Sequence, residues 1–305
     1  MTTSTPPSAA DRAWTEEIVY TETEDGLQLA GIAIRPAATT ARLTARAVIV
    51  WIHGNASNFY APAYVAIGRE LATRGHPVIS ANTRGHDISA IIGGAAGPMA
   101  GTGGGAGWER FEETPRDLAA WVGRAASLAG ETGEETGGGA GVIVAGHSSG
   151  AQRVALYAAE RPDPRVRGLV LASPDLRGFF PPGEIDAART LVAAGKDLEV
   201  LPAQPYVPWY RQCARTVSSR ADVTARRFAD DAPEPALLAI AVPILAFYGT
   251  REHNAATHLE GIRARAAAAP RVDTPLISDA DHFYTGHEPE IAETIATWAA
   301  ALTTA

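Results

Sequence analysis

The residues with the clearest chemical potential form the pentapeptide Gly146-His147-Ser148-Ser149-Gly150. An apolar, β-branched run at residues 142–145 precedes it, and a sequence with helical periodicity follows it. This pattern predicts a strand that turns sharply into a helix, with Ser148 at the corner. Glycine has no Cβ atom, so the two flanking glycines would let strand and helix approach closely. We interpret Ser148 as a nucleophile beside a helix N-terminus, whose partial positive charge favours an oxyanion. The alternative is a glycine-rich turn without a chemical role.

A serine hydroxyl is a weak nucleophile unless a base removes its proton, and histidine is the usual base. His282 is the candidate, because it follows the last predicted strand and precedes the last predicted helix. A loop at the carboxyl end of a parallel strand can reach a serine at the same edge of the sheet. His147 is adjacent to Ser148 in the chain and is expected to face away from it.

The base in turn needs a carboxylate that orients it. Glu252 follows the predicted strand at residues 243–248, and Asp175 follows the preceding predicted strand. Either residue gives the chain order serine, acid, histidine. Glu252 is the first choice and Asp175 the alternative.

The negative charge that develops during attack on a carbonyl needs two fixed hydrogen-bond donors. The N–H group of Ser149, directly after the nucleophile, is one candidate. The other is the N–H group of Asn55, in the loop His53-Gly54-Asn55 after the first central strand. The alternative for this loop is an ordinary strand-ending turn.

Composition limits the classes of function. The chain has 305 residues, is 46% hydrophobic and carries a formal net charge of −8. This charge argues against nucleic acid or an anionic membrane surface as the main partner. The single cysteine, Cys213, excludes an intramolecular disulfide and is consistent with a reducing compartment. With no recognisable signal peptide and no apolar run of membrane-spanning length, we expect a cytoplasmic protein. Its oligomeric state stays open.

The remaining pattern predicts an α/β fold. Asp25-Gly26 between two alternating runs indicates a hairpin. Continuous apolar runs such as residues 47–52 alternate with helical segments, which is typical of a mostly parallel central sheet with helices on both faces. The glycine-rich residues 90–107 are expected to form a loop. The last helix is expected to begin at Pro289.

Alternation of strands and helices is interrupted between residues 176 and 240. We therefore predict a disordered tail at residues 1–16, a core at residues 17–175 and 241–305, and a helical cap insertion at residues 176–240. The cap carries five aromatic residues that are candidates for substrate binding or for the core of the cap itself: Phe179, Phe180, Tyr206, Trp209 and Tyr210.

Taken together, the motifs resemble those of the α/β-hydrolase superfamily, in its capped esterase- and lipase-like branch. The resemblance covers roughly residues 17–302 and rests on Trp51-Ile52-His53-Gly54-Asn55, Asn82-Thr83-Arg84-Gly85-His86-Asp87, Gly146–Gly150, Gly249-Thr250-Arg251-Glu252 and Asp281-His282. It implies a Ser-His-acid triad with no cofactor. No metal site is expected either, because His253 and His258 are five residues apart and would not share a helical face. Residues 184–201 and 248–252 are faintly similar to siderophore-ester hydrolases. Glu252 stands where that superfamily usually has aspartate, which keeps Asp175 under consideration.

These features favour a serine hydrolase that cleaves a small, partly apolar carboxylic ester or lactone through an acyl-enzyme. A thioesterase, cyclase or acyltransferase would use the same residues and differ only in the acyl acceptor. A non-catalytic small-molecule receptor on the same fold is the alternative outside enzyme chemistry.

Overall fold

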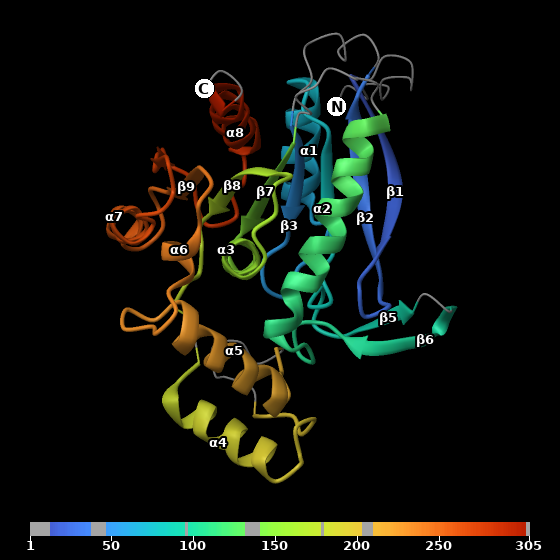
Figure 1. Cartoon of the computed structure of the whole chain (residues 1–305), viewed down its shortest axis with the longest axis vertical. Coiled ribbons are helices and arrows are strands. Elements are labelled where there is room, and N and C mark those ends of the chain that lie inside the picture. The colour runs from blue at the N-terminus through green and yellow to red at the C-terminus, as the bar shows by residue number, and fades with distance from the viewer. Residues whose placement is uncertain are drawn as a thin grey trace, which may run out of the picture.

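The central feature of the computed structural model is a twisted, mostly parallel sheet with helices on both faces (Figure 1). The structure describes residues 13–37, 47–94, 97–131, 141–177, 180–202 and 210–302. The prediction of a disordered tail at residues 1–16 is wrong at its end. Strand β1 (Trp14–Glu22) begins inside that range and pairs with β2 (Gln28–Pro36) along its whole length. Residues 1–12 lie outside the described residues.

The strands of the main sheet follow the order β1-β2-β4-β3-β7-β8-β9-β10, and β11 also pairs with β9. Their bounds are β1 (Trp14–Glu22), β2 (Gln28–Pro36), β3 (Val48–Ile52), β4 (Val78–Ala81), β7 (Val142–His147), β8 (Val166–Ala172), β9 (Ile244–Gly249), β10 (Val272–Asp273) and β11 (Leu276–Ile277). The first two strands form the predicted antiparallel hairpin, and β2 also pairs antiparallel with β4. The other neighbours in this sheet, from β4 through β3, β7, β8 and β9 to β10 and β11, pair in parallel. Every residue of β3, β7 and β9 is buried, as continuous apolar runs predict.

The helices are α1 (Pro62–Thr73), α2 (Thr114–Glu131), α3 (Ser149–Glu160), α4 (Pro182–Ala193), α5 (Ala214–Arg227), α6 (Ala236–Ala239), α7 (Ala255–Arg265) and α8 (Glu288–Leu302). Two hydrophobic cores cover the two faces of the sheet. Side chains of α1 and α8, such as Ile67 and Ile295, pack on one face. Side chains of α2, α3 and α7, such as Leu118, Val154 and Leu259, pack on the other. None of the described helices is both long and apolar enough to span a membrane.

The prediction of a loop at residues 90–107 is wrong. Residues in β5 (Ala90–Gly94) and β6 (Gly97–Gly104) form an antiparallel ribbon that projects beside the main sheet (Figure 1). Its glycines hide the side-chain alternation that usually marks a strand, although Ile91 is exposed and Ile92 is buried.

The segment predicted as an insertion contains α4, α5 and α6. Helices α4 and α5 pack on each other at one end of the molecule (Figure 1), around a small separate core of Ala188, Leu201, Ala214 and Val217. Helix α6 instead contacts α3 and α7 beside the sheet. Helix α5 is fastened to the core, because the N–H of Cys213 donates to the carbonyl of Gly107 (2.9 Å) and the Thr216 hydroxyl donates to the carbonyl of Glu109 (2.8 Å).

Candidate active site

Ser148 stands at the corner between β7 and α3, with the unusual backbone angles φ 55° and ψ −121°. Its N–H group donates to the carbonyl of Ala172 on the neighbouring strand at 2.8 Å. A Cβ atom at Gly150 would collide with the carbonyl oxygens of Ile52 and His53, so only glycine fits there. The pentapeptide predicts a strained backbone at this point, held in place by the contacts around it.

His282 and Glu252 are brought together by the loops after β11 and β9. The Nδ1–H group of His282 donates to Glu252 Oε2 at 2.7 Å. The other oxygen, Oε1, accepts from the Ser173 hydroxyl (2.5 Å) and from the N–H group of Gly249 (2.8 Å). Burial raises the pKa of Glu252, but the bonds from His282, Ser173 and Gly249 outweigh it and lower that pKa below 4.5. The carboxylate is therefore ionised at neutral pH.

The two partners differ in their exposure. The Glu252 side chain is 11% exposed, whereas the His282 side chain is 38% exposed. The acid is thus sheltered from water, whereas more than a third of the imidazole side chain is accessible. Among the described residues no hydrogen bond joins the Ser148 hydroxyl to His282. Such bonds are often long in ligand-free enzymes and tighten with substrate.

Asp175 lies on the loop after β8, also close to Ser148. Its backbone N–H group donates to the carbonyl of Ser148 at 3.3 Å. Within the described part of the chain, its carboxylate makes no hydrogen bond to His282, whose Nδ1 is engaged by Glu252. The geometry therefore pairs the histidine with the first-choice acid.

His147, which the sequence suggested only as a residue facing away from Ser148, forms a hydrogen bond to the backbone of His282. Its Nε2–H group donates to the backbone carbonyl of His282 at 2.7 Å, and its Nδ1 accepts from the Tyr64 hydroxyl at 2.8 Å. The Tyr64 oxygen accepts from the N–H group of Gly54 at 3.1 Å. Burial, followed by the charge of His282, lowers the pKa of His147 to about 4. A neutral imidazole of fixed tautomer therefore links the loop after β3 to the loop that carries His282.

The loop after β3 carries Asn55, one of the two predicted oxyanion donors, and the other, Ser149, is the first residue of α3. His53 is fully buried; its Nδ1–H donates to the carbonyl of Gly54 (2.7 Å), and its Nε2 accepts from the N–H group of Thr83 (3.1 Å). Burial, with a smaller effect of Arg153, lowers the pKa of His53 to about 3, so it stays neutral. No acceptor for the N–H of Asn55 or of Ser149 is found among the described residues.

Arg220 on α5 is the main residue that sequence reasoning missed. Its guanidinium group donates to Asn55 Oδ1 at 2.6 Å and to the Ser149 hydroxyl at 2.8 Å. It is only 3% exposed and lies 4.9 Å from the centre of the Phe111 ring. One side chain from the predicted cap therefore bonds to the side chains of both candidate oxyanion residues. A lone arginine in a polar helix carries no sequence signal for this role.

A buried ion pair lies behind Arg220. Arg153 and Glu109, both with fully buried side chains, form two hydrogen bonds at 2.5 and 2.7 Å. Arg153 also lies 4.6 Å from the centre of the Phe111 ring, so two guanidinium groups contact one aromatic ring. A paired, bidentate geometry is what makes buried charges tolerable. Arg220 is therefore in contact with a ring, Phe111, that this buried ion pair also contacts.

The five aromatic candidates have different outcomes. The hydroxyl of Tyr210 lies within hydrogen-bond distance of two acceptors, Asn55 Oδ1 (3.2 Å) and the carbonyl of Ala106 (3.1 Å), to which its one proton can be donated. Phe180 packs against the small core of α4 and α5. Phe179, Tyr206 and Trp209 lie outside the described residues.

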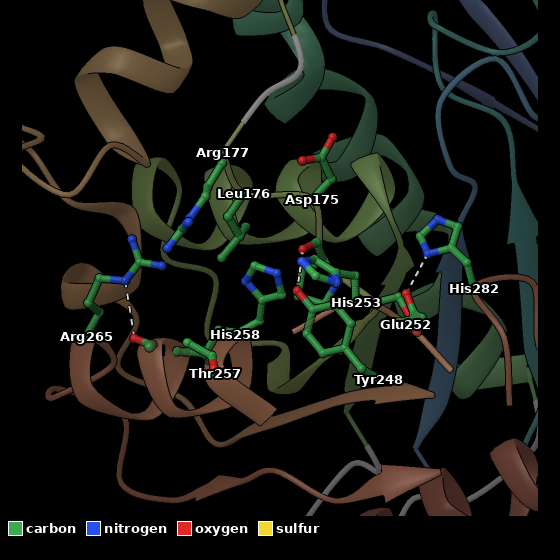
Figure 2. Close-up of a pocket in the computed structure, with 14 residues that line it drawn as sticks. Asp175, Leu176, Arg177, Tyr248, Glu252, His253, Thr257, His258, Arg265 and His282 are labelled. Carbon is green, nitrogen blue, oxygen red and sulfur yellow. Dashed lines mark hydrogen bonds and ion pairs between the residues drawn. The ribbon is translucent and has the colours of Figure 1, made fainter. Parts of the chain in front are cut away.

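A cavity of about 230 Å³ opens beside His282 (Figure 2). Its wall comes from the loop after β8, from β9 and the loop that follows it, and from α7. His282 and Glu252 line one part of it, and Leu176 and Ile262 contribute apolar surface. The cavity can therefore hold part of a small molecule next to the imidazole.

Solved structures share this fold. A soluble variant of monoglyceride lipase from Saccharomyces cerevisiae is 14% identical, with a TM-score of 0.69 over 98% of this chain and 99% of the other. Est1E from Butyrivibrio proteoclasticus, with ferulic acid bound, is 17% identical, with a TM-score of 0.62 over 94% and 100%. The Pyrococcus furiosus esterase Pf2001 is 17% identical, with a TM-score of 0.57 over 96% and 95%. At these identities the likeness establishes the fold alone.

No curated protein matches the chain. A family model described as serine aminopeptidase, S33, matches residues 44–273. This match covers the turn between β7 and α3 that carries Ser148, the loop of Asn55 and the loop of Glu252, and it extends over more than half of the chain. The chain therefore belongs to the serine aminopeptidase S33 family of α/β-hydrolase enzymes.

Proposed function

We propose that this enzyme hydrolyses a carboxylic ester of a small, partly apolar molecule through an acyl-enzyme on Ser148. The observation that carries the proposal is the hydrogen bond of 2.7 Å between His282 Nδ1 and Glu252, next to a strained serine at the end of β7. This bond fixes the tautomer in which Nε2 can accept a proton.

In the proposed reaction, the Ser148 hydroxyl attacks the ester carbonyl and His282 removes its proton. The imidazolium that forms is stabilised by the Glu252 carboxylate, which is ionised and sheltered from water. The imidazolium then protonates the leaving alcohol. Water, activated by the same histidine, attacks the acyl-enzyme and regenerates the serine.

The N–H groups of Asn55 and Ser149 hold the oxyanion in the proposed tetrahedral intermediate. Donors of this kind are effective because they are oriented before the reaction begins. Arg220 supports this orientation, since it bonds to the side chains of both residues. We therefore assign Arg220 a positioning role, with α4 and α5 acting as a cap over the site.

The same groups would serve a lactone substrate, a thioesterase, a cyclase or an acyltransferase, because only the acyl donor or acceptor differs. The family description also brings amides into consideration. Short-chain p-nitrophenyl esters, a lactone, a thioester and an aminoacyl anilide, each with and without an added alcohol acceptor, separate these activities.

The decisive variants are Ser148→Ala and His282→Ala. Each should lower kcat for the best ester by about 10³-fold or more while the melting temperature stays close to that of the parent. A fluorophosphonate should label the parent at Ser148 and leave Ser148→Ala unlabelled. Turnover near the parent rate in either variant would rule out the proposed mechanism, and a parent that neither reacts nor labels would favour a binding protein.

A further inference from the structure

One part of the cavity beside His282 is basic. Arg177, from the loop after β8, and Arg265, at the end of α7, both line it. Figure 2 shows their guanidinium groups directed towards the same region, on the side of His258 away from His282. Arg177 is exposed, and Arg265 is partly buried, with 28% of its side chain accessible.

Arg265 is held in place by main-chain groups. Its Nε–H donates to the carbonyl of Gly261 and one terminal N–H donates to the carbonyl of Phe228, both at 3.2 Å. Its carboxylate neighbour Asp230, at 3.6 Å, is 83% exposed, and such surface pairs contribute little energy. The guanidinium group is thus oriented by neutral acceptors and retains its positive charge towards the cavity.

His258 contributes no further charge at neutral pH. Its ring stacks on Tyr248, with centres 5.5 Å apart and planes at 26°. Burial lowers the pKa of His258 below 6.5, and the nearby Arg177, His253 and, to a smaller extent, Arg265 act in the same direction.

The carboxylates that line the cavity do not balance this charge. Glu252 is engaged by His282, Ser173 and Gly249. In Figure 2 the carboxylate of Asp175 turns away from the two guanidinium groups. A cavity with two converging arginines beside a catalytic imidazole matches a ligand that carries its own negative charge.

We propose that this basic end of the cavity binds a carboxylate on the substrate, so that the preferred substrates are esters bearing a second, free carboxylate group. This inference rests on the proposed esterase function and specifies its substrate class. The carboxylate can belong to the acyl part or to the leaving alcohol, and both place a negative charge beyond His282.

The test compares substrates of matched length. p-Nitrophenyl hemiesters of succinate, glutarate and adipate are paired with neutral p-nitrophenyl esters of the same chain length, which carry a methyl group in place of the carboxylate. Acetate esters of hydroxy acids and of simple alcohols place the charge in the leaving group instead. In one of these series the parent should prefer the charged member in kcat/KM by about tenfold or more, as one charge-assisted hydrogen bond supplies.

Arg177→Gln and Arg265→Gln should each remove most of this preference through KM and leave the neutral esters within about twofold. Arg263→Gln is the matched control, because Arg263 is an exposed arginine on the same helix that bonds to Thr274 outside the cavity. The preference for the charged ester should also shrink as the salt concentration is raised from about 0.05 M to about 0.5 M, because ions screen partly exposed charges.

A second readout does not depend on turnover. Glutarate should bind the Ser148→Ala variant in calorimetry, and Arg177→Gln added to that variant should weaken the binding by about tenfold. Equal turnover of charged and neutral esters, unaffected by either arginine, would overturn the anionic subsite and leave the esterase intact. Glutarate binding that depends on Arg177 in a protein that turns over no ester would refute the esterase and retain the subsite.

Discussion

The proposed oxyanion side and the proposed base side of Ser148 differ in how deeply their polar side chains are buried. On the oxyanion side, Arg220 is 3% exposed and bonds to the side chains of Asn55 and Ser149. On the base side, the His282 side chain is 38% exposed and borders a cavity of about 230 Å³. One side is closed by a helix of the predicted cap, and the other is open to a ligand.

This difference follows from the two tasks. Oxyanion donors act by being fixed before charge develops, so additional bonds that immobilise them help. A base must accept a proton, pass it to the leaving group and meet water, so one of its nitrogens must stay accessible. His282 is accordingly held by Glu252 through Nδ1 and by His147 through its backbone carbonyl, and no hydrogen bond to its Nε2 is found among the described residues.

The largest effect should come from the base side. Glu252→Gln keeps the volume of the side chain but removes the charge that stabilises the imidazolium, so kcat should fall by about 10²-fold or more. Asp175→Asn should lower kcat by less than about threefold, because its carboxylate does not bond to His282. Steady-state kinetics on one ester decides the ranking. The reverse ranking would make Asp175 the functional acid.

On the oxyanion side, Arg220→Lys and Arg220→Gln should lower kcat by about 10- to 100-fold with KM nearly unchanged, since a lysine cannot bond to Asn55 and Ser149 through one planar fork. Affinity for a trifluoromethyl ketone should fall by the same factor. Arg215→Gln on α5 is the control, because Arg215 donates to the carbonyl of Trp108 away from these residues. Loss of stability in the Arg220 variants without a change in kcat would make Arg220 a structural residue only.

The buried histidines of both sides predict acid sensitivity. Folding lowers the pKa of His147 to about 4 and that of His53 to about 3, from 6.5, by burial. Between pH 6.5 and about 4 the unfolded chain binds more protons than the folded chain, so the free energy of unfolding should fall as pH falls through this range. The loss should amount to a few kcal/mol, at about 1.4 kcal/mol per pKa unit.

Urea titrations at pH 7, 5.5 and 4.5 measure this slope. His147→Gln is less stable at pH 7, because two hydrogen bonds are altered, but its stability should depend less steeply on pH. The slope of His287→Gln, a surface histidine paired with Glu290, serves as the reference. A slope in His147→Gln equal to that of the reference would mean that His147 is not held neutral.

The smallest effect concerns the two described cap aromatics. Tyr210→Phe removes the hydroxyl that bonds to Asn55 and should lower kcat by about threefold, close to the worth of one neutral hydrogen bond. Phe180→Ala should lower the melting temperature without changing substrate preference, because Phe180 packs into the small core of α4 and α5. A change of preference in Phe180→Ala would place that residue at the substrate instead.

The strands and helices that carry the site were readable because their signals are local. The apolar runs of β3, β7 and β9 and the spacing of Ile291, Ile295 and Trp298 on α8 report burial directly. The ribbon at residues 90–104 was missed because glycine carries no side-chain pattern, although its backbone can pair as in any strand.

Within the site, motif order was sufficient to propose Ser148, Glu252 and His282, because each follows a strand at the same edge of the sheet. The hydrogen bonds of Arg220 to Asn55 and Ser149 could not be predicted from the sequence. Its two partners are 165 and 71 residues away in sequence, and no spacing rule connects a cap helix to loops of the core. The same holds for the contact of His147 with the backbone of His282, which is 135 residues away.

The sequence by itself determined the alternation of strands and helices, the strained serine and the order of the reactive groups, because local propensity, glycine placement and apolar periodicity act over a few residues. The tertiary structure alone decided which carboxylate bonds to His282, that α5 delivers an arginine to the oxyanion loop, and that Arg177 and Arg265 face one cavity. Those relations depend on how distant segments pack, and long-range packing is set by the summed burial of the whole chain rather than by any short pattern within it.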